Sequence, residues 1–132
     1  MRNRSSVVIV KEHELAVIKR IKNGSVYYVF PGGGIEDGET PEAAAKREAL
    51  EELGVEVNVH NCIAKVEFNG TQYFFLSEII GGILGTGKGE EYLENSNNGY
   101  YIPMWVDIDQ LSVIDIKPKE IALKVQEGIS II

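Results

Sequence analysis

The sequence predicts an α/β or α+β fold in which helices pack on a mixed β-sheet. Two observations lead to this prediction. Short β-rich runs alternate with turn residues, and two helical segments stand among them, the first directly after a glycine cluster. The expected order of elements is β-β-β-α-β-β-β-α. The 132 residues fit a single domain over residues 1–132, because domains commonly contain about 100–200 residues.

Three strands are expected before the first helix. They cover residues 4–10, 14–20 and 25–30. His13 and its charged neighbours make the first turn, and Asn23-Gly24 is a strong signal for the second. The Pro-Gly-Gly-Gly run at residues 31–34 is expected to interrupt regular structure, because proline and glycine both disfavour it.

The first helix is predicted over residues 41–53. Thr40 suits the N-cap, where its hydroxyl can accept a hydrogen bond from a backbone amide of the first turn. Pro41 suits the first helical position, which needs no amide donor. Gly54 suits the left-handed position just beyond the last turn.

The second half of the chain is expected to be mostly β. Strands over residues 55–66 and 71–80 are joined by the Asn69-Gly70 turn, and a further strand covers residues 100–107. Residues 81–99 are glycine-rich and lack apolar periodicity, so they are expected to form a long loop. A short turn follows at residues 107–111, and an amphipathic helix is predicted over residues 118–128.

The composition excludes several classes of partner. The net charge is −7 and the pI is near 4.9, whereas a protein that binds duplex nucleic acid usually carries a basic surface. No apolar run approaches the roughly 20 residues that a membrane span needs. The apolar run at residues 5–10 is also too short for a signal peptide, so a cytoplasmic protein is expected.

Three carboxylates gather on the first predicted helix. At 100° per residue, Glu48, Glu51 and Glu52 share an arc about 100° wide in the C-terminal half of the helix. Like charges at these spacings cost about 0.2–0.5 kcal/mol per pair, and the helix dipole disfavours anions there. Two interpretations remain open on this evidence: a solvated acidic face, which pairing of Arg47 with Glu51 would support, or a site for hard divalent cations.

The residues around these carboxylates carry a longer motif. A glycine is followed by five residues, a glutamate, seven residues and then Arg-Glu-Ala-Leu-Glu-Glu-Leu-Gly-Val. This pattern resembles the Nudix box, in which the matching residues are Gly33, Glu39, Arg47, Glu48, Glu51, Glu52, Gly54 and Val55. Seven fixed identities of about 1 in 10 each, over about a hundred windows, put a chance match on the order of one in 10⁵.

The resemblance implies a Nudix hydrolase with an α/β/α sandwich around a mixed central β-sheet. Such an enzyme hydrolyses a pyrophosphate bond in a nucleoside diphosphate linked to another moiety, by attack of water on phosphorus. The implied cofactor is Mg²⁺, for which Mn²⁺ can substitute. The implied ligands are the carboxylates of Glu48, Glu51 and Glu52 with the carbonyl of Gly33.

The resemblance also assigns roles to single residues. Glu48 or Glu52 is the candidate general base, and Arg47 with Glu39 is expected to brace the loop against the helix. Arg20 matches the position of a phosphate-contacting arginine in some members, or is a solvent-exposed cation at a strand end. A fourth carboxylate is expected from the glycine-rich loop, either Glu90 or Glu91.

Two further alternatives stay open. The aromatic residues of the strands could stack on a base or belong to the core; they are Tyr27, Phe74, Tyr100 and Trp105. The alternative function is a non-catalytic Nudix-like domain that senses nucleotides. Such domains usually lose box carboxylates, and this sequence keeps them. The implied partners are a nucleotide or nucleotide derivative and, as is common in the family, a second copy of the chain in a homodimer.

Overall fold

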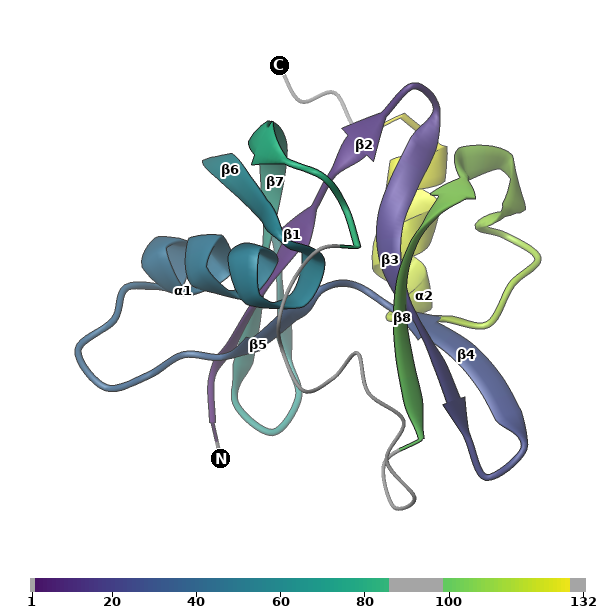
Figure 1. Ribbon diagram of the computed structural model, residues 1–132. Helices are drawn as coiled ribbons and strands as arrows, with labels where there is room; N and C mark the ends of the chain where they lie inside the picture. Colours follow the sequence, from purple (N-terminus) through teal and green to yellow (C-terminus); the bar gives the residue numbers. More distant parts are fainter. Residues whose placement is uncertain (1, 86–98, 129–132) are drawn as a thin grey trace.

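The computed structural model describes residues 2–85 and 99–128 (Figure 1). Its strands are β1 Arg4–Val8, β2 Val10–Lys11, β3 Glu14–Lys22, β4 Ser25–Val29, β5 Gly32–Gly34, β6 Val55–Glu67, β7 Thr71–Gly82, β8 Tyr100–Asp107 and β9 Ile116–Lys117. Its helical segments are α1 Pro41–Glu48, η1 Ala49–Leu53, η3 Ile108–Gln110 and α2 Lys119–Gln126. In these two ranges, no helix is long and apolar enough to cross a membrane.

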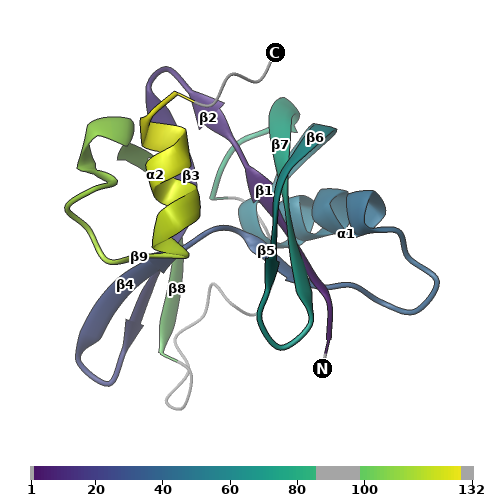
Figure 2. The ribbon, with the colours of Figure 1, turned by 180° about the vertical axis from the view of Figure 1, so that it is seen from behind.

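The strands form two sheets. The first sheet has the order β5-β1-β7-β6, and the second has the order β2-β3-β4-β9 with β8 also paired to β3. Each sheet is mixed, because β1 runs parallel to β7 and β4 runs parallel to β9. Helix α1 covers one face of this β layer and α2 the opposite face, as the two views in Figures 1 and 2 show. The predicted α/β/α sandwich is therefore confirmed, with two sheets in the middle layer.

Two apolar clusters hold the layers together. One joins both sheets to α2 and contains Phe30 and Phe74, whose rings meet edge to face with centroids 5.6 Å apart. The other lies under α1, where Ala45, Ala49 and Leu53 pack against residues of both sheets. Small residues on α1 let the helix backbone lie close to the β layer.

The glycine run contradicts the prediction that residues 31–34 interrupt regular structure. Gly32–Gly34 forms β5, which pairs antiparallel with the first residues of β1. A Cβ on Gly32 would overlap the Ser5 carbonyl, so this close approach requires glycine at that position. The strand is short and has no side chains of its own, which is why its sequence lacks the usual β signals.

The predicted turns and helix caps are confirmed. Asn23-Gly24 and Asn69-Gly70 each have positive φ at both residues, as tight hairpin turns require. The Thr40 hydroxyl accepts a hydrogen bond from the Ala43 amide at 3.0 Å. Gly54 adopts the left-handed conformation, with φ +78°, where the helix ends.

The predicted helix over residues 41–53 is correct in extent but not in type. Residues 49–53 wind as a π-helix, a form that occurs mostly as single turns and frequently at functional sites. Leu50 and Glu52 lie in this wider turn, and Glu48 directly precedes it. Leu50 is 53% exposed, whereas Glu48 and Glu52 are each only 8% exposed. Of the two interpretations left open by the sequence, a solvated acidic face does not describe Glu48 and Glu52, because both are buried.

We expect Thr40→Ala to lower the free energy of unfolding by about 1 kcal/mol, because the first amides of α1 lose their capping acceptor. Urea denaturation of the two proteins measures the difference. Thr40→Ser, which keeps a hydroxyl at the cap, serves as the control and should stay close to the wild type. An alanine variant as stable as the wild type would show that the cap contributes nothing.

Candidate active site

The glycine strand β5 lies directly against the two buried carboxylates of the helix. The Gly32 amide donates a hydrogen bond of 2.7 Å to Oε1 of Glu52. Gly33 faces Glu48 so closely that a Cβ on Gly33 would overlap the Glu48 carboxylate. Both contacts depend on the absence of a side chain on the strand. The backbone of β5 and the carboxylates of Glu48 and Glu52 therefore form one compact group of oxygen and nitrogen atoms.

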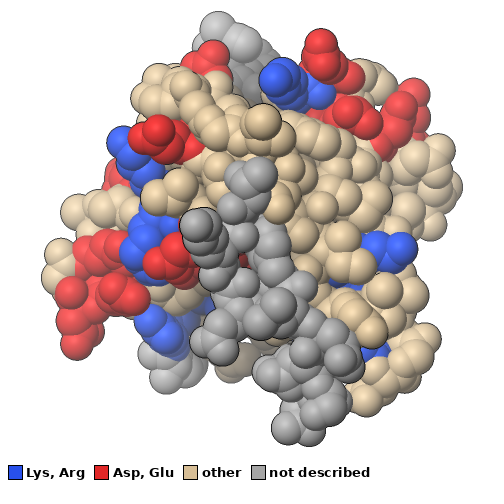
Figure 3. Space-filling view, in the orientation of Figure 1, with Lys and Arg blue, Asp and Glu red and all other residues tan. Residues whose placement is uncertain are grey.

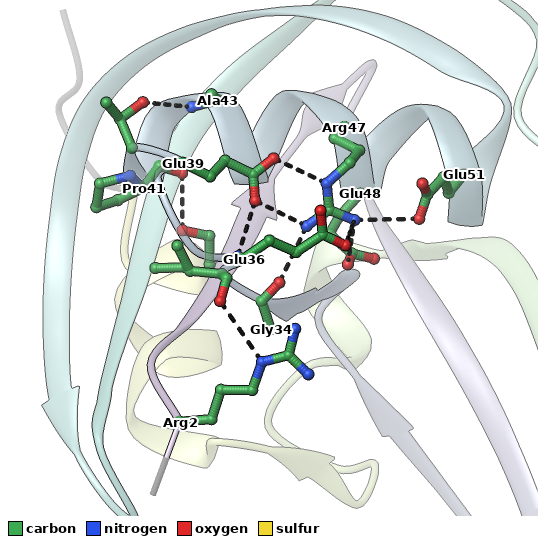
Figure 4. A network of polar contacts seen from close by, with 12 residues as sticks. Arg2, Gly34, Glu36, Glu39, Pro41, Ala43, Arg47, Glu48 and Glu51 are labelled. Carbon is green, nitrogen blue, oxygen red and sulfur yellow. Dashed lines mark hydrogen bonds and ion pairs between the residues drawn. The ribbon is translucent and has the colours of Figure 1, made fainter.

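Arg47 connects the loop before α1 with the carboxylates on the helix (Figure 4). Its Nε and Nη2 donate to the two oxygens of Glu39, at 2.8 and 3.0 Å, and Nη2 also donates to the Gly34 carbonyl at 3.0 Å. Its Nη1 donates to Glu48 at 3.0 Å and to Glu51 at 3.2 Å. One guanidinium thus fixes the loop to the helix and partly neutralises two neighbouring carboxylates.

Charge on this side of the molecule is closely mixed. Figure 3 shows acidic side chains next to basic ones over α1 and the loop before it. The Glu51 side chain is 52% exposed and Glu36 lies 3.9 Å from Arg47, so both belong to the outer part of the network. The predicted pairing of Arg47 with Glu51 is present. It coexists with two buried carboxylates, which a merely solvated acidic face would not contain.

The ion pair between Arg47 and Glu39 shifts the pKa of both side chains. The hydrogen bonds from Arg47, supported by the backbone amide of Glu36, lower the pKa of the Glu39 carboxyl to about 2. The same bonds raise the pKa of the Arg47 guanidinium above its already high ordinary value. Both groups are therefore charged at neutral pH.

A cleft of about 640 Å³ opens beside the carboxylates. Residues of both sheets line it, and Gly32 and Glu52 belong to its wall. Three cationic side chains share the same cleft: Arg4 on β1, Arg20 on β3 and Lys117 on β9. The three cations can bind an anionic ligand in the cleft, and the nearby carboxylate of Glu52 can bind a metal ion that neutralises part of the ligand's charge.

Arg20, the predicted substrate residue, lies in this cleft. Its guanidinium stacks on the Tyr101 ring at 3.6 Å from the ring centroid and is 5.7 Å from that of Tyr27. Its Nε donates to the Tyr100 carbonyl at 3.4 Å. These contacts orient the guanidinium. Lys117, whose Nζ lies 4.7 Å from the Tyr27 ring centroid, was not predicted, because only the pairing of β9 with β4 brings it to the cleft.

The other sequence candidates have different positions. Phe74 is 1% exposed and belongs to the core, and Trp105 is partly buried and packs against the cluster under α1. Tyr100 is 44% exposed. Glu90 and Glu91, predicted as a fourth carboxylate, lie outside the described residues.

A second group of metal-ligand side chains lies on other elements. In the described part of the chain, ligand atoms of His13, Asp107 and Asp109 lie within 4.8 Å of one another. All three residues are exposed, and His13 pairs with Asp109 at 3.1 Å, which raises the pKa of the imidazole. These contacts explain the cluster as an ion-paired surface group that ties the β2–β3 turn to η3.

Comparison with known families agrees with the box and its geometry. The family model described as the NUDIX domain matches residues 1–124, so the chain belongs to the Nudix family. It is 46% identical over 56 residues to the ADP-sugar pyrophosphatase of Mus musculus, which is 42% of this chain and 23% of that protein. It is 55% identical over 31 residues to the 8-oxo-dGTP diphosphatase of Proteus vulgaris, which is 24% of this chain and 28% of that protein. The matches thus span under a third of either relative.

Solved structures share the fold over nearly the whole chain. A structure of MutT, from work on Aliivibrio salmonicida and Vibrio cholerae, superposes with a TM-score of 0.73 and 22% identity over 96% of this chain and 97% of that one. An ADP-ribose pyrophosphatase from Streptococcus suis gives a TM-score of 0.71 with 15% identity, over 96% of this chain and 90% of that one. At these identities the likeness concerns the fold.

We expect Glu39→Gln to reduce stability at neutral pH and to make it less sensitive to acid. Because the folded-state pKa of Glu39 is below its ordinary value of 4.5, its pairing stabilises the protein fully above about pH 4.5. That contribution is lost as the pH falls toward 2. The difference in unfolding free energy between wild type and variant should therefore narrow over this range, as measured by urea denaturation at several pH values.

The matched control is Glu127→Gln, which removes an exposed carboxylate beyond the end of α2. This variant shows how far the removal of one exposed negative charge, without an ion pair in the described part of the chain, changes the free energy of unfolding. If the Glu39→Gln difference stayed constant from pH 6 to pH 2.5, the Arg47–Glu39 pair would not control the acid response.

Proposed function

We propose that this protein is a divalent-metal-dependent pyrophosphohydrolase that cleaves a nucleoside diphosphate linked to another moiety. One observation carries the proposal: the box carboxylate Glu52 lies on the wall of a cleft that also contains Arg4, Arg20 and Lys117. The cations suit the phosphates, and the carboxylates suit the metal and the attacking water. The names of the Mus musculus and Proteus vulgaris relatives, both diphosphate-cleaving enzymes, support the same reaction class.

The residues present fit a hard divalent cation. Mg²⁺ and Mn²⁺ prefer carboxylate and carbonyl oxygens, and Glu48, Glu51, Glu52 and the Gly33 carbonyl offer such a set. Gly33 is compatible with this role because the space that a Cβ would take is filled by the Glu48 carboxylate. When bound, the metal would neutralise the diphosphate and acidify a bound water.

The chain's own groups account for orientation and proton transfer. The Gly32 amide holds one oxygen of Glu52, which fixes the direction of the carboxylate. Arg47 holds Glu48 and, through Glu39, keeps the loop against the helix. In the reaction, the oxygen of water bonds to phosphorus, the bridging P–O bond breaks, and Glu48 or Glu52 accepts the proton of the water.

The cationic walls of the cleft would bind the rest of the diphosphate. Arg20 is held flat on Tyr101, so its guanidinium loses little freedom when it meets an anion. Lys117 is the second candidate for a phosphate contact. Neither side chain takes part in the bond changes themselves.

We expect Glu52→Gln to keep the fold and to lose at least about a hundredfold in kcat, because a general base or metal ligand contributes that much or more. Hydrolysis of a panel of nucleoside triphosphates, dinucleoside polyphosphates and nucleotide sugars, with and without Mg²⁺, provides the measurement. The exposed Glu42→Gln on α1 is the control and should leave the rate unchanged. A wild type that binds nucleotides but hydrolyses none would instead indicate the non-catalytic sensing domain.

We also expect Mn²⁺ to raise the melting temperature of the protein. A ligand that binds only the native state stabilises it by about 2.7 kcal/mol at a hundredfold excess over its Kd. Glu48→Gln should shrink this rise, because it removes a charged ligand, whereas the exposed Glu127→Gln should leave it unchanged. An unmoved melting curve at millimolar metal would mean that the free protein has no such site.

A further inference from the structure

An exposed aromatic residue, Phe68, lies in the same cleft as Glu52. It follows β6 at the turn of the β6–β7 hairpin and is 66% exposed. A single exposed apolar side chain is common on protein surfaces and needs no explanation by itself. Its membership of the cleft wall, together with the catalytic carboxylate, is what distinguishes Phe68 from the other exposed apolar residues.

The hairpin turn that displays Phe68 is firmly held. The Phe68 amide donates to the Gly70 carbonyl at 2.8 Å, which closes the turn. The Thr71 amide donates to the Asn3 side chain at 3.0 Å, and the Thr71 hydroxyl donates to the Glu67 carboxylate at 3.0 Å. The turn is thus fixed to the N-terminal segment. A ring displayed on a braced turn loses little conformational entropy when a ligand packs against it.

Polar side chains share this end of the cleft with Phe68. Gln72 on β7 lies between Arg4 of β1 and Val66 of β6 in the sheet, and all three line the cleft with Phe68. Gln72 offers an amide with both donors and an acceptor, and Arg4 offers donors. A flat apolar ring beside such groups matches the chemistry of a nucleobase, which has a π face and an edge of donors and acceptors.

The strand register sets the distance between this region and the carboxylates. Gly32, which bonds Glu52, pairs with Ser6, and Ser6 pairs with Phe74 on β7. On β7, Gln72 lies two residues closer to the hairpin turn than Phe74. Its partner on β6 is Val66, and Phe68 lies two residues further toward the turn than Val66. These steps add up to four residues, so at about 3.3 Å per residue Phe68 lies about 13 Å along the strands from Gly32, whose amide binds Glu52. A nucleoside and its diphosphate can cover such a span.

We propose that Phe68 and Gln72 form the nucleobase subsite of this cleft, with the base stacked on Phe68 and its edge on the Gln72 amide. The substrate then lies along the strands, with its base at the β6–β7 turn and its diphosphate beside Glu52. This inference rests on the proposed function for the orientation of the substrate. Base binding itself is independent of hydrolysis. Because stacking needs only a π face, purines, with their larger rings, should bind more tightly than pyrimidines.

The test compares the binding of AMP, GMP, CMP and UMP with that of ribose 5-phosphate, by calorimetry without metal. The wild type should bind AMP or GMP more tightly than ribose 5-phosphate. Phe68→Ala should weaken purine nucleotide binding by at least about tenfold and leave ribose 5-phosphate unchanged, whereas Phe68→Tyr should retain it. The control is Val113→Ala, an apolar residue that is 72% exposed and does not line this cleft. Unchanged melting temperatures would show that the variants fold.

A second measurement uses Phe68→Trp as a reporter. Stacking of a base should quench the fluorescence of the new indole on addition of AMP or GMP, but not of ribose 5-phosphate, above the background of Trp105. Equal affinities of wild type and Phe68→Ala, or no base-dependent binding by the wild type at millimolar nucleotide, would overturn the subsite. Loss of base binding in Phe68→Ala would support it even if the wild type proved not to hydrolyse pyrophosphates, because hydrolysis is measured separately.

Discussion

The structure depends on one cation, the Arg47 guanidinium. Three glutamates that approach one another on a helix repel, and two of them are buried, which would destabilise the helix without a compensating charge. Arg47 supplies that charge to Glu48 and Glu51 and at the same time binds Glu39 and the Gly34 carbonyl of the loop. The Arg47 contacts that offset the repulsion between the carboxylates therefore also fix the loop and the glycine strand to the helix.

This arrangement also explains the glycines. Because the alanines of α1 let the helix lie close to the β layer, the edge strand β5 has room for no side chains at Gly32, beside Ser5 of β1, or at Gly33, beside Glu48 of α1. Gly32 then presents its amide to Glu52, and Gly33 leaves room for Glu48. A metal ion bound by Glu48 and Glu51 would compete with Arg47 Nη1 for their oxygens. The same contacts that stabilise the metal-free protein would thus set the affinity for metal.

Features governed by local sequence could be predicted, and features governed by tertiary packing could not. The Asn-Gly turns, the Thr40 cap and the Gly54 terminus follow from backbone preferences of neighbouring residues. The Nudix box at residues 33–55 could be identified from the spacing of its glycines, glutamates and arginine. In contrast, no local signal marks the π turn at residues 49–53, and the strand at Gly32–Gly34 forms by pairing with β1, about 28 residues earlier in the sequence. Phe68 and Lys117 carry no local signal, because their place in the cleft depends on how the two sheets pack.

The proposed reaction requires that water attacks phosphorus at the carboxylate end of the cleft. The most direct test incubates the protein with Mg²⁺ and the nucleotide that it hydrolyses fastest, in water enriched in ¹⁸O, followed by mass spectrometry of both products. Attack on phosphorus should place one ¹⁸O atom in a phosphate group of one product and none in a sugar ring or its hydroxyls. Label on a sugar carbon, which would mean cleavage of a C–O bond, or no hydrolysis of any nucleotide of the panel at any metal concentration, would rule this reaction out.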